Sequence, residues 1–138
     1  MRNQTGVTLM ELMIVMVVIG ILSAIAYPSY RDQVRRSNRT EGKVALEQNA
    51  QALEKCFTRY MRYDDVDNCP AAAQFEDNAT VTTPGGHYRV AGEINATTFT
   101  LTAVPQGGQA SDTRCMNLTL TSAGARGISG SANAKSCW

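Results

Sequence analysis

The stretch that decides the fold lies near the start of the chain and reads GVTLMELMIVMVVIGILSAIAYPSY, residues 6–30. Between Val7 and Tyr27 it carries one charged side chain, the carboxylate of Glu11. As a helix these residues extend roughly 31 Å at ~1.5 Å per residue, enough for a hydrocarbon core of about 30 Å. We therefore predict a membrane-spanning helix. Glu11 is a candidate functional residue, because an ionisable side chain is costly at membrane depth.

This stretch resembles the class III signal of type IV prepilins, in which a short leader ends in glycine and a long apolar helix follows. The residues that carry the resemblance are Gly6, Val7, Glu11, Gly20 and Pro28. It implies a leader of residues 1–6, cleavage between Gly6 and Val7, and N-methylation of Val7. Val7 departs from the family, which usually has phenylalanine there. A conventional secretory signal peptide is the alternative, but it would place Glu11 inside its apolar core.

The resemblance also implies a mechanism of assembly and a set of partners. In the family, the glutamate that matches Glu11 pairs with the N-terminal amine of a neighbouring subunit, and the helix between the positions of Gly20 and Pro28 loses order in filaments. Glycine and proline both weaken a helix at these points. The implied partners are other pilin subunits, the prepilin peptidase and methyltransferase, the inner-membrane assembly platform and the inner membrane itself. The globular domain is then periplasmic before assembly, and the final location is the extracellular pilus.

Beyond Pro28 the pattern predicts a second helical part, residues 29–63, after the membrane part of residues 7–28. Apolar residues recur there with steps of three and four, which is one face of a helix, at Leu46, Ala50, Leu53, Phe57 and Met61. The helix should end near Tyr63, before a cluster of aspartates. Residues 64–138 should then form a connecting loop and an antiparallel sheet.

Alternation of apolar and hydroxylated residues predicts three strands in that sheet. They contain Tyr88 and Val90, then Phe99 to Ala103, then Leu118 to Thr121. A turn is expected around Gly92. The fold class is α+β: a long N-terminal helix whose second half packs on a small antiparallel sheet stapled by disulfides.

Four cysteines lie outside the apolar stretch: Cys56, Cys69, Cys115 and Cys137. They allow three pairings, and we expect Cys56 with Cys69 and Cys115 with Cys137, each with its neighbour along the chain. A zinc site is the alternative, but no pair has the usual short spacing and the chain's one histidine, His87, is remote in sequence. Disulfides indicate an oxidising compartment. The positive-inside rule, applied alone to the arginines that follow the apolar stretch, would place that end of the stretch in the cytoplasm.

Charge and composition point to a structural protein. The chain has 13 Lys and Arg against 12 Asp and Glu, so no global field attracts nucleic acid. No nucleophile with a base and no paired carboxylates can be assembled, so we expect no enzyme, cofactor or metal. A basic group on the helix is expected to contact lipid headgroups or acidic groups of neighbouring subunits, with contact to nucleic-acid phosphates as the alternative: Arg31, Arg35, Arg36, Arg39 and Lys43. The remaining candidates for DNA contact are scattered along the sheet region: Arg89, Arg114, Arg126 and Lys135.

The C-terminal part adds a weaker resemblance. Thr100-Leu101-Thr102-Ala103, Pro105-Gln106-Gly107 and the closing Cys137-Trp138 are similar to minor pilins of the pilin E type. The implied function is a structural subunit, a minor pilin, that is assembled into a type IV pilus and supports pilus biogenesis, twitching motility and adhesion. A DNA-binding pilin for natural transformation, a major pilin and a type II secretion pseudopilin are the alternatives.

Overall fold

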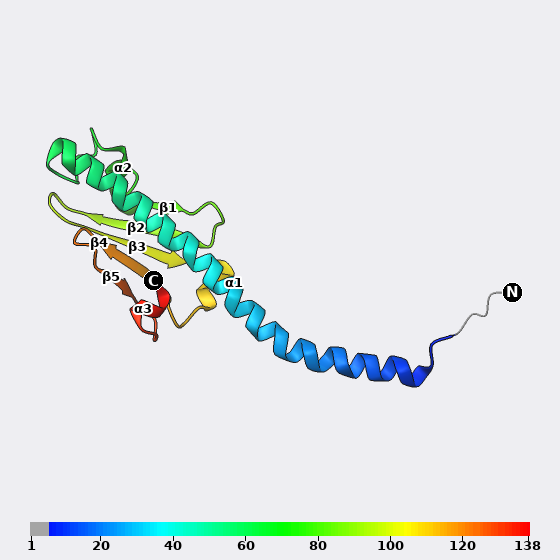
Figure 1. Cartoon of the computed structure of the whole chain (residues 1–138). Helices are drawn as coiled ribbons and strands as arrows, with labels where there is room; N and C mark the ends of the chain where they lie inside the picture. The colour runs from blue at the N-terminus through cyan, green and yellow to red at the C-terminus, as the bar shows by residue number, and fades with distance from the viewer. Residues whose placement is uncertain (1–5) are drawn as a thin grey trace. The chain divides into compact units, whose positions relative to one another are not determined.

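The structure, a computed structural model, describes residues 6–138. Of the expected leader, Gly6 is described and the rest lies outside these residues. The chain divides into two compact units, Met1–Val34 and Arg35–Trp138. Helix α1 (Leu9–Tyr60) has residues in both (Figure 1).

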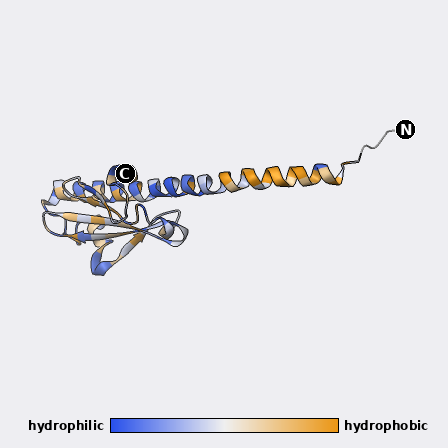
Figure 2. Ribbon diagram, turned by 90° about the horizontal axis from the view of Figure 1, so that it is seen from below, coloured by the Kyte–Doolittle hydropathy of each residue, from blue (hydrophilic) through white to orange (hydrophobic). Residues whose placement is uncertain are grey.

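In the first unit α1 is apolar and exposed. Every described side chain up to Val34 is exposed, and Figure 2 shows this part of the helix as a hydrophobic stretch. An 18-residue window of α1 has a mean hydropathy of 2.6, so the helix is long and apolar enough to cross a membrane. Apolar side chains that the described chain leaves uncovered suit lipid or other subunits.

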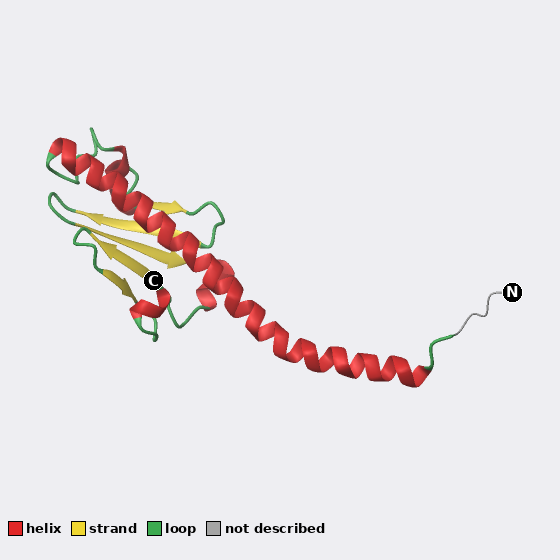
Figure 3. Ribbon diagram, in the orientation of Figure 1, coloured by secondary structure: helices red, strands yellow, loops and turns green. Residues whose placement is uncertain are grey.

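The second unit is built on a five-stranded antiparallel sheet (Figure 3). Its strands follow one another in sheet order as they do in the chain: β1 (Thr80–Thr82), β2 (Tyr88–Ile94), β3 (Phe99–Pro105), β4 (Leu118–Thr121) and β5 (Arg126–Ile128). Four short helices complete the unit: α2 (Pro70–Ala73) and η1 (Glu76–Asn78) precede β1, η2 (Gly107–Ser111) lies between β3 and β4, and α3 (Ala134–Cys137) follows β5. The predicted α+β class and the packing of the helix on an antiparallel sheet are confirmed.

The core lies between α1 and one face of the sheet. Leu46 and Leu53 of α1 and Leu101 of β3 are completely buried, and β3 alternates buried and half-buried residues along its whole length. This is the period of two expected for a strand with one covered face. The other face carries threonines in paired positions, such as Thr102 opposite Thr119. The predicted alternation is therefore the physical basis of the sheet.

The C-terminal end of α1 differs from the prediction. The helix ends at Tyr60, because Met61 adopts a left-handed backbone conformation with φ 57°, a common way for a helix to terminate. Met61, expected on the buried face, is 73% exposed. Tyr63, expected as the last helical residue, is instead buried in the segment that follows.

The expected turn around Gly92 is wrong, since Gly92 lies inside β2 opposite Leu101. The reversal comes later, where Asn95 N–H donates to the carbonyl of Thr98. Gly92 is required for a different reason: a Cβ at this position would lie 2.8 Å from Cγ of Phe75. The glycine thus lets the ring of Phe75 lie directly on the strand.

Two strands were not predicted. β1 and β5 are three residues long, and β5 contains Gly127. Strands this short show too little alternation to be recognised, and glycine is depleted in strands. Both lie at the edges of the sheet, where short strands are common.

Candidate functional site

The first site is the start of α1. Thr8 precedes the helix, and its Oγ1 accepts a hydrogen bond from the backbone N–H of Glu11 at 3.3 Å. Thr8 and Glu11 thus have the spacing of a capping box, which sequence reasoning missed although the pattern Thr-x-x-Glu is readable. The carboxylate of Glu11 is exposed and has no ion pair among residues 6–138. It lies in the first helical turn, where the positive end of the helix dipole favours an acid.

Gly20 and Pro28 lie in continuous helix. Pro28 removes one backbone donor, but the helix is uninterrupted from Leu9 to Tyr60. The loss of order that the resemblance assigns to this stretch concerns assembled filaments. For this chain it stays a prediction.

Two disulfides tie the second unit together. Cys56 bonds to Cys69 and Cys115 to Cys137, with Cα–Cα distances of 5.7 and 5.8 Å. These are the pairs expected from the sequence. The first closes the turn after α1, and the second joins the chain before β4 to α3.

Residues 61–79, which we call the acidic segment, connect α1 to the sheet. The segment has one arginine and five acids: Asp64, Asp65, Asp67, Glu76 and Asp77. Two buried rings anchor it. Phe75 lies on Gly92, and Tyr63 stacks on Phe57 with ring centroids 4.5 Å apart.

The phenol of Tyr63 donates a hydrogen bond to Glu54 at 2.9 Å. Burial, and then this bond, raises the pKa of Tyr63 to about 12. At the surface of the segment, Arg62 pairs with Asp64 at 2.7 Å. The Arg62 guanidinium lowers the pKa of the Asp64 carboxyl.

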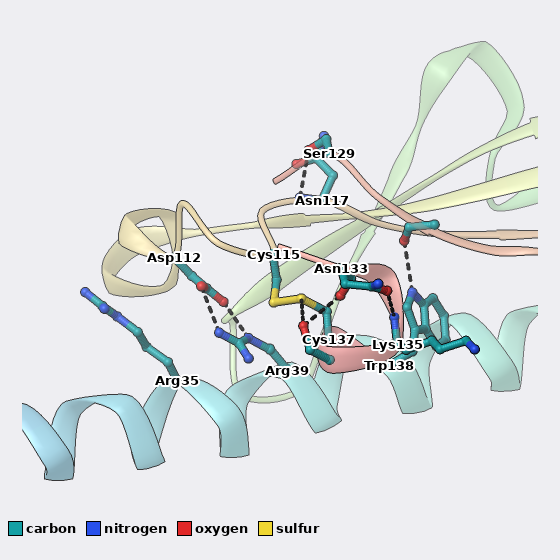
Figure 4. Close-up of a disulfide and its surroundings, with 12 residues drawn as sticks. Arg35, Arg39, Asp112, Cys115, Asn117, Ser129, Asn133, Lys135, Cys137 and Trp138 are labelled. Carbon is teal, nitrogen blue, oxygen red and sulfur yellow. Dashed lines mark hydrogen bonds and ion pairs between the residues drawn. A yellow bond between two sulfur atoms is a disulfide. The ribbon is translucent and has the colours of Figure 1, made fainter. Parts of the chain in front are cut away.

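Residues 113–138, which we call the basic segment, contain no acid and three cations: Arg114, Arg126 and Lys135. Two short runs of its backbone lie against each other, with Gly130 N–H donating to the carbonyl of Cys115 and Ala132 N–H to that of Arg114. Asn133 caps α3 by accepting from the N–H of Lys135 at 3.0 Å. Figure 4 shows this arrangement around the disulfide.

The disulfide and these backbone bonds gather cations that are scattered in sequence. Arg114 directly precedes Cys115, and Lys135 lies two residues before Cys137. Both side chains are exposed, and neither has an ion pair within the described part of the chain. Arg89 is also exposed, on β2, outside this segment. The disulfide and the backbone bonds thus bring the chain at Arg114 close to the chain at Lys135, and Arg126 lies on β5, which α3 contacts.

Arg126 is held from two sides. Its Nη2 lies 2.7 Å from Oε1 of Glu47 on α1, and its guanidinium lies over the ring of Trp138, 5.1 Å from the centroid. The indole of Trp138 in turn donates to the carbonyl of Gly127 at 2.9 Å. Arg126 is 54% exposed and Glu47 39%, so the ion pair faces solvent.

A buried polar network fixes the part of the chain that directly precedes the basic segment. Asp112 accepts two hydrogen bonds from Arg39, at 2.6 and 2.9 Å, and its side chain is 2% exposed. Gln109, also buried, donates to Asp112, to the phenol of Tyr88 and to the carbonyl of Arg35. These bonds fix η2 and the chain up to Asp112 on α1.

The basic group predicted on the helix is not a single free surface. Arg39 forms an ion pair with Asp112, and the guanidinium of Arg35 donates a hydrogen bond to the hydroxyl of Ser111 at 3.0 Å. Lys43 is half-buried, and its pKa is lowered by burial and by the nearby positive charges of Arg39 and Arg126. His87 lies 4.0 Å from Glu41 and belongs to neither disulfide region.

Comparison with known proteins adds two family matches. Residues 1–27 match the prokaryotic N-terminal methylation motif. Residues 28–119, more than half of the chain, match the family described as type IV minor pilin ComP, DNA uptake sequence receptor. The sequence analysis also expected a minor pilin, of the pilin E type.

Among curated relatives, the type IV major pilin PilA of Myxococcus xanthus is 43% identical over 67 residues, which are 49% of this chain and 30% of the relative. The type IV major alpha-pilin of Moraxella bovis is 48% identical over 52 residues, covering 36% of this chain and 33% of that protein. The matches thus span about a third of these relatives.

A solved type IV pilin from Shewanella oneidensis has the same fold. The TM-score is 0.51 at 24% identity, over 75% of this chain and 97% of that structure. A methylation motif, an apolar helix, a disulfide-tied sheet and a family match over most of the second unit agree with one another. The chain belongs to the type IV pilin family, within the minor pilin group described as ComP.

Proposed function

We propose that this chain is a minor pilin that binds double-stranded DNA through its basic segment as part of a type IV pilus. One observation carries the proposal. From residue 94 to residue 138 the one acid is Asp112, which is buried and paired, whereas Arg114 and Lys135 are exposed and unpaired among the described residues. The family that matches residues 28–119 is described as a DNA uptake sequence receptor, which agrees with this chemistry.

The side chains of the basic segment suit a nucleic acid. Arginine and lysine neutralise DNA phosphates and supply most of the affinity for DNA. This affinity falls as the salt concentration rises, because the release of counterions from the DNA becomes less favourable. Between the cations the segment is rich in Ser, Thr, Asn and Gly. Hydroxyl, amide and backbone N–H groups contact both phosphates and base edges. The acidic segment would repel the same ligand.

The test compares two double variants of the full chain in detergent micelles. Arg114→Gln with Lys135→Gln should weaken binding to duplex DNA roughly tenfold and lower the salt slope by about two, one per lost phosphate contact. The matched control, Lys55→Gln with Arg59→Gln, removes two exposed cations from the end of α1 beside the acidic segment. An equal loss in the control would place the DNA elsewhere, and no binding by the wild type at low salt would disprove the proposal.

We further propose that the N-terminal segment serves assembly. A prepilin peptidase cuts between Gly6 and Val7, Val7 is methylated, and the Glu11 carboxylate pairs with the Val7 amine of a neighbouring subunit. Glu11 is exposed on an apolar helix and has no ion pair within residues 6–138, which supports this role, because an acid in a low-dielectric setting needs a partner. The inner membrane and the assembly platform then hold the subunit, with its sheet domain in the periplasm, before the helix between Gly20 and Pro28 loses order in the filament.

Glu11→Gln tests this assembly role. The amide keeps the size of the side chain and loses the charge, so we expect normal cleavage but much less of the subunit in sheared filaments. Normal incorporation would show that Glu11 serves recognition by the peptidase or the capping of α1 instead. The same immunoblot, read for abundance, distinguishes a minor subunit from a major one, the class to which PilA and the alpha-pilin belong.

A further inference from the structure

The ion pair between Glu47 and Arg126 is placed where the proposed ligand would bind. Arg126 is one of the three cations of the basic segment, and Glu47 comes from α1, 79 residues away in sequence. Oε1 of Glu47 and Nη2 of Arg126 are 2.7 Å apart. A carboxylate oxygen at this distance has the geometry that a phosphate oxygen would adopt on the same guanidinium.

The surroundings of this pair are cationic. Lys43 lies one helical turn before Glu47 on α1. Burial lowers the pKa of Lys43, and the nearby positive charges of Arg39 and Arg126 lower it further. Glu47 is thus an acid among cations. Because both partners are substantially exposed, the ion pair is weak and a phosphate can replace the carboxylate.

Trp138 makes such an exchange possible without loss of the arginine's position. Its ring lies beneath the Arg126 guanidinium and is itself fixed by a hydrogen bond to Gly127. When Glu47 releases the guanidinium, the indole still holds it at the surface. Arg126 can therefore change its anionic partner while staying in place.

We propose that Glu47 is an internal competitor of DNA phosphate for Arg126, and that it lowers the affinity of the basic segment for DNA. The inference rests on the proposed DNA-binding function and deepens it, since it names a residue that sets the strength of that function. In the free chain Glu47 neutralises Arg126. In the complex a phosphate replaces Glu47 on the Arg126 guanidinium. The Glu47 carboxylate then loses its ion pair, and this loss lowers the net affinity for DNA.

The experiment is a mutant cycle in the full chain, in micelles, read by DNA titration at several salt concentrations. Glu47→Gln should tighten binding about two- to fivefold, the value of an exposed ion pair, and steepen the salt slope by about one. The control is Glu54→Gln, which removes the same charge two turns further along α1, where Glu54 accepts from Tyr63 rather than from an arginine. In an Arg126→Gln background, Glu47→Gln should do no more than Glu54→Gln does.

Two outcomes would overturn the proposal: weaker binding by Glu47→Gln, or the same change in both glutamine variants. A second readout uses inorganic pyrophosphate and the NMR signal of the Arg126 Nε–H group. Glu47→Gln should let pyrophosphate shift this signal at severalfold lower concentration than in the wild type. If the wild type binds no DNA, the proposed function fails, and the pyrophosphate titration still decides whether Glu47 competes for Arg126.

Discussion

The second unit uses the same covalent device twice, in surroundings of opposite charge. The disulfide between Cys56 and Cys69 ties the acidic segment to the end of α1, whereas the one between Cys115 and Cys137 closes a loop with cations and no acid. The first is filled with packed rings, and the second is held by backbone hydrogen bonds and caps. The difference teaches that a disulfide fixes position, while the side chains around it decide what the loop can bind.

The largest expected effect concerns the buried pair that leads into the basic segment. Asp112→Ala should lower the free energy of unfolding by about 3–5 kcal/mol, because it removes the buried carboxylate that accepts two hydrogen bonds from the guanidinium of Arg39. The matched change in the acidic segment, Asp64→Ala, breaks an exposed pair and should cost far less. Urea unfolding of the full chain in micelles measures both. Equal costs would show that the two segments are not anchored differently.

Removing each disulfide in turn should separate its effect on the free energy of unfolding from its effect on DNA binding. Serine at both Cys56 and Cys69, or at both Cys115 and Cys137, should cost about 2–4 kcal/mol, and loop length alone separates the two by only about half a kcal/mol. DNA binding should weaken in the second variant alone, since Arg114 and Lys135 are then no longer held together. Unfolding curves and DNA titrations on the same samples test this. Equal loss of DNA binding in both would assign the effect to the stability of the whole sheet domain.

The smallest effect is a pH dependence that belongs to the acidic segment. The pKa of Tyr63 is raised to about 12, mainly by burial, against about 10 in an unfolded chain. Its stabilising contribution is therefore complete below pH 10 and is lost as the pH rises toward 12, by about 1–2 kcal/mol. Tyr63→Phe should flatten this decline, although Tyr88, whose pKa burial also raises, leaves a residual slope.

Tyr60→Phe is the control for this measurement, because Tyr60 lies in the same region but is 36% exposed. It should leave the alkaline decline unchanged when unfolding is followed from pH 9 to 12. A decline that Tyr63→Phe does not alter would show that another group titrates. The basic segment contains no tyrosine, so no phenol of that segment contributes to this slope.

The sequence was most informative where structure depends on local pattern. The apolar stretch, the helical face with Leu46 and Leu53, and the alternation of β3 each follow from a periodicity that a single segment carries. Nearest-neighbour pairing of the cysteines also matched, because the strands form a meander and segments close in sequence stay close in space.

Features that depend on distant contacts could not be read in this way. Gly92 looks like a turn residue until Phe75, from the acidic segment, is seen to lie on it. The cations Arg114 and Lys135 look dispersed until a disulfide joins their neighbours. Arg39, expected as part of an exposed basic group, is removed from the surface by Asp112, 73 residues away. Each case requires knowledge of a partner remote in sequence.

The position of α3 beside β5 has a consequence for aggregation. β5 is an edge strand, and an edge with free backbone acceptors can template another strand. α3 lies beside this edge strand, which is only three residues long. A chain expected to polymerise through its helix thus has a sheet edge that is poorly suited to amyloid-like growth.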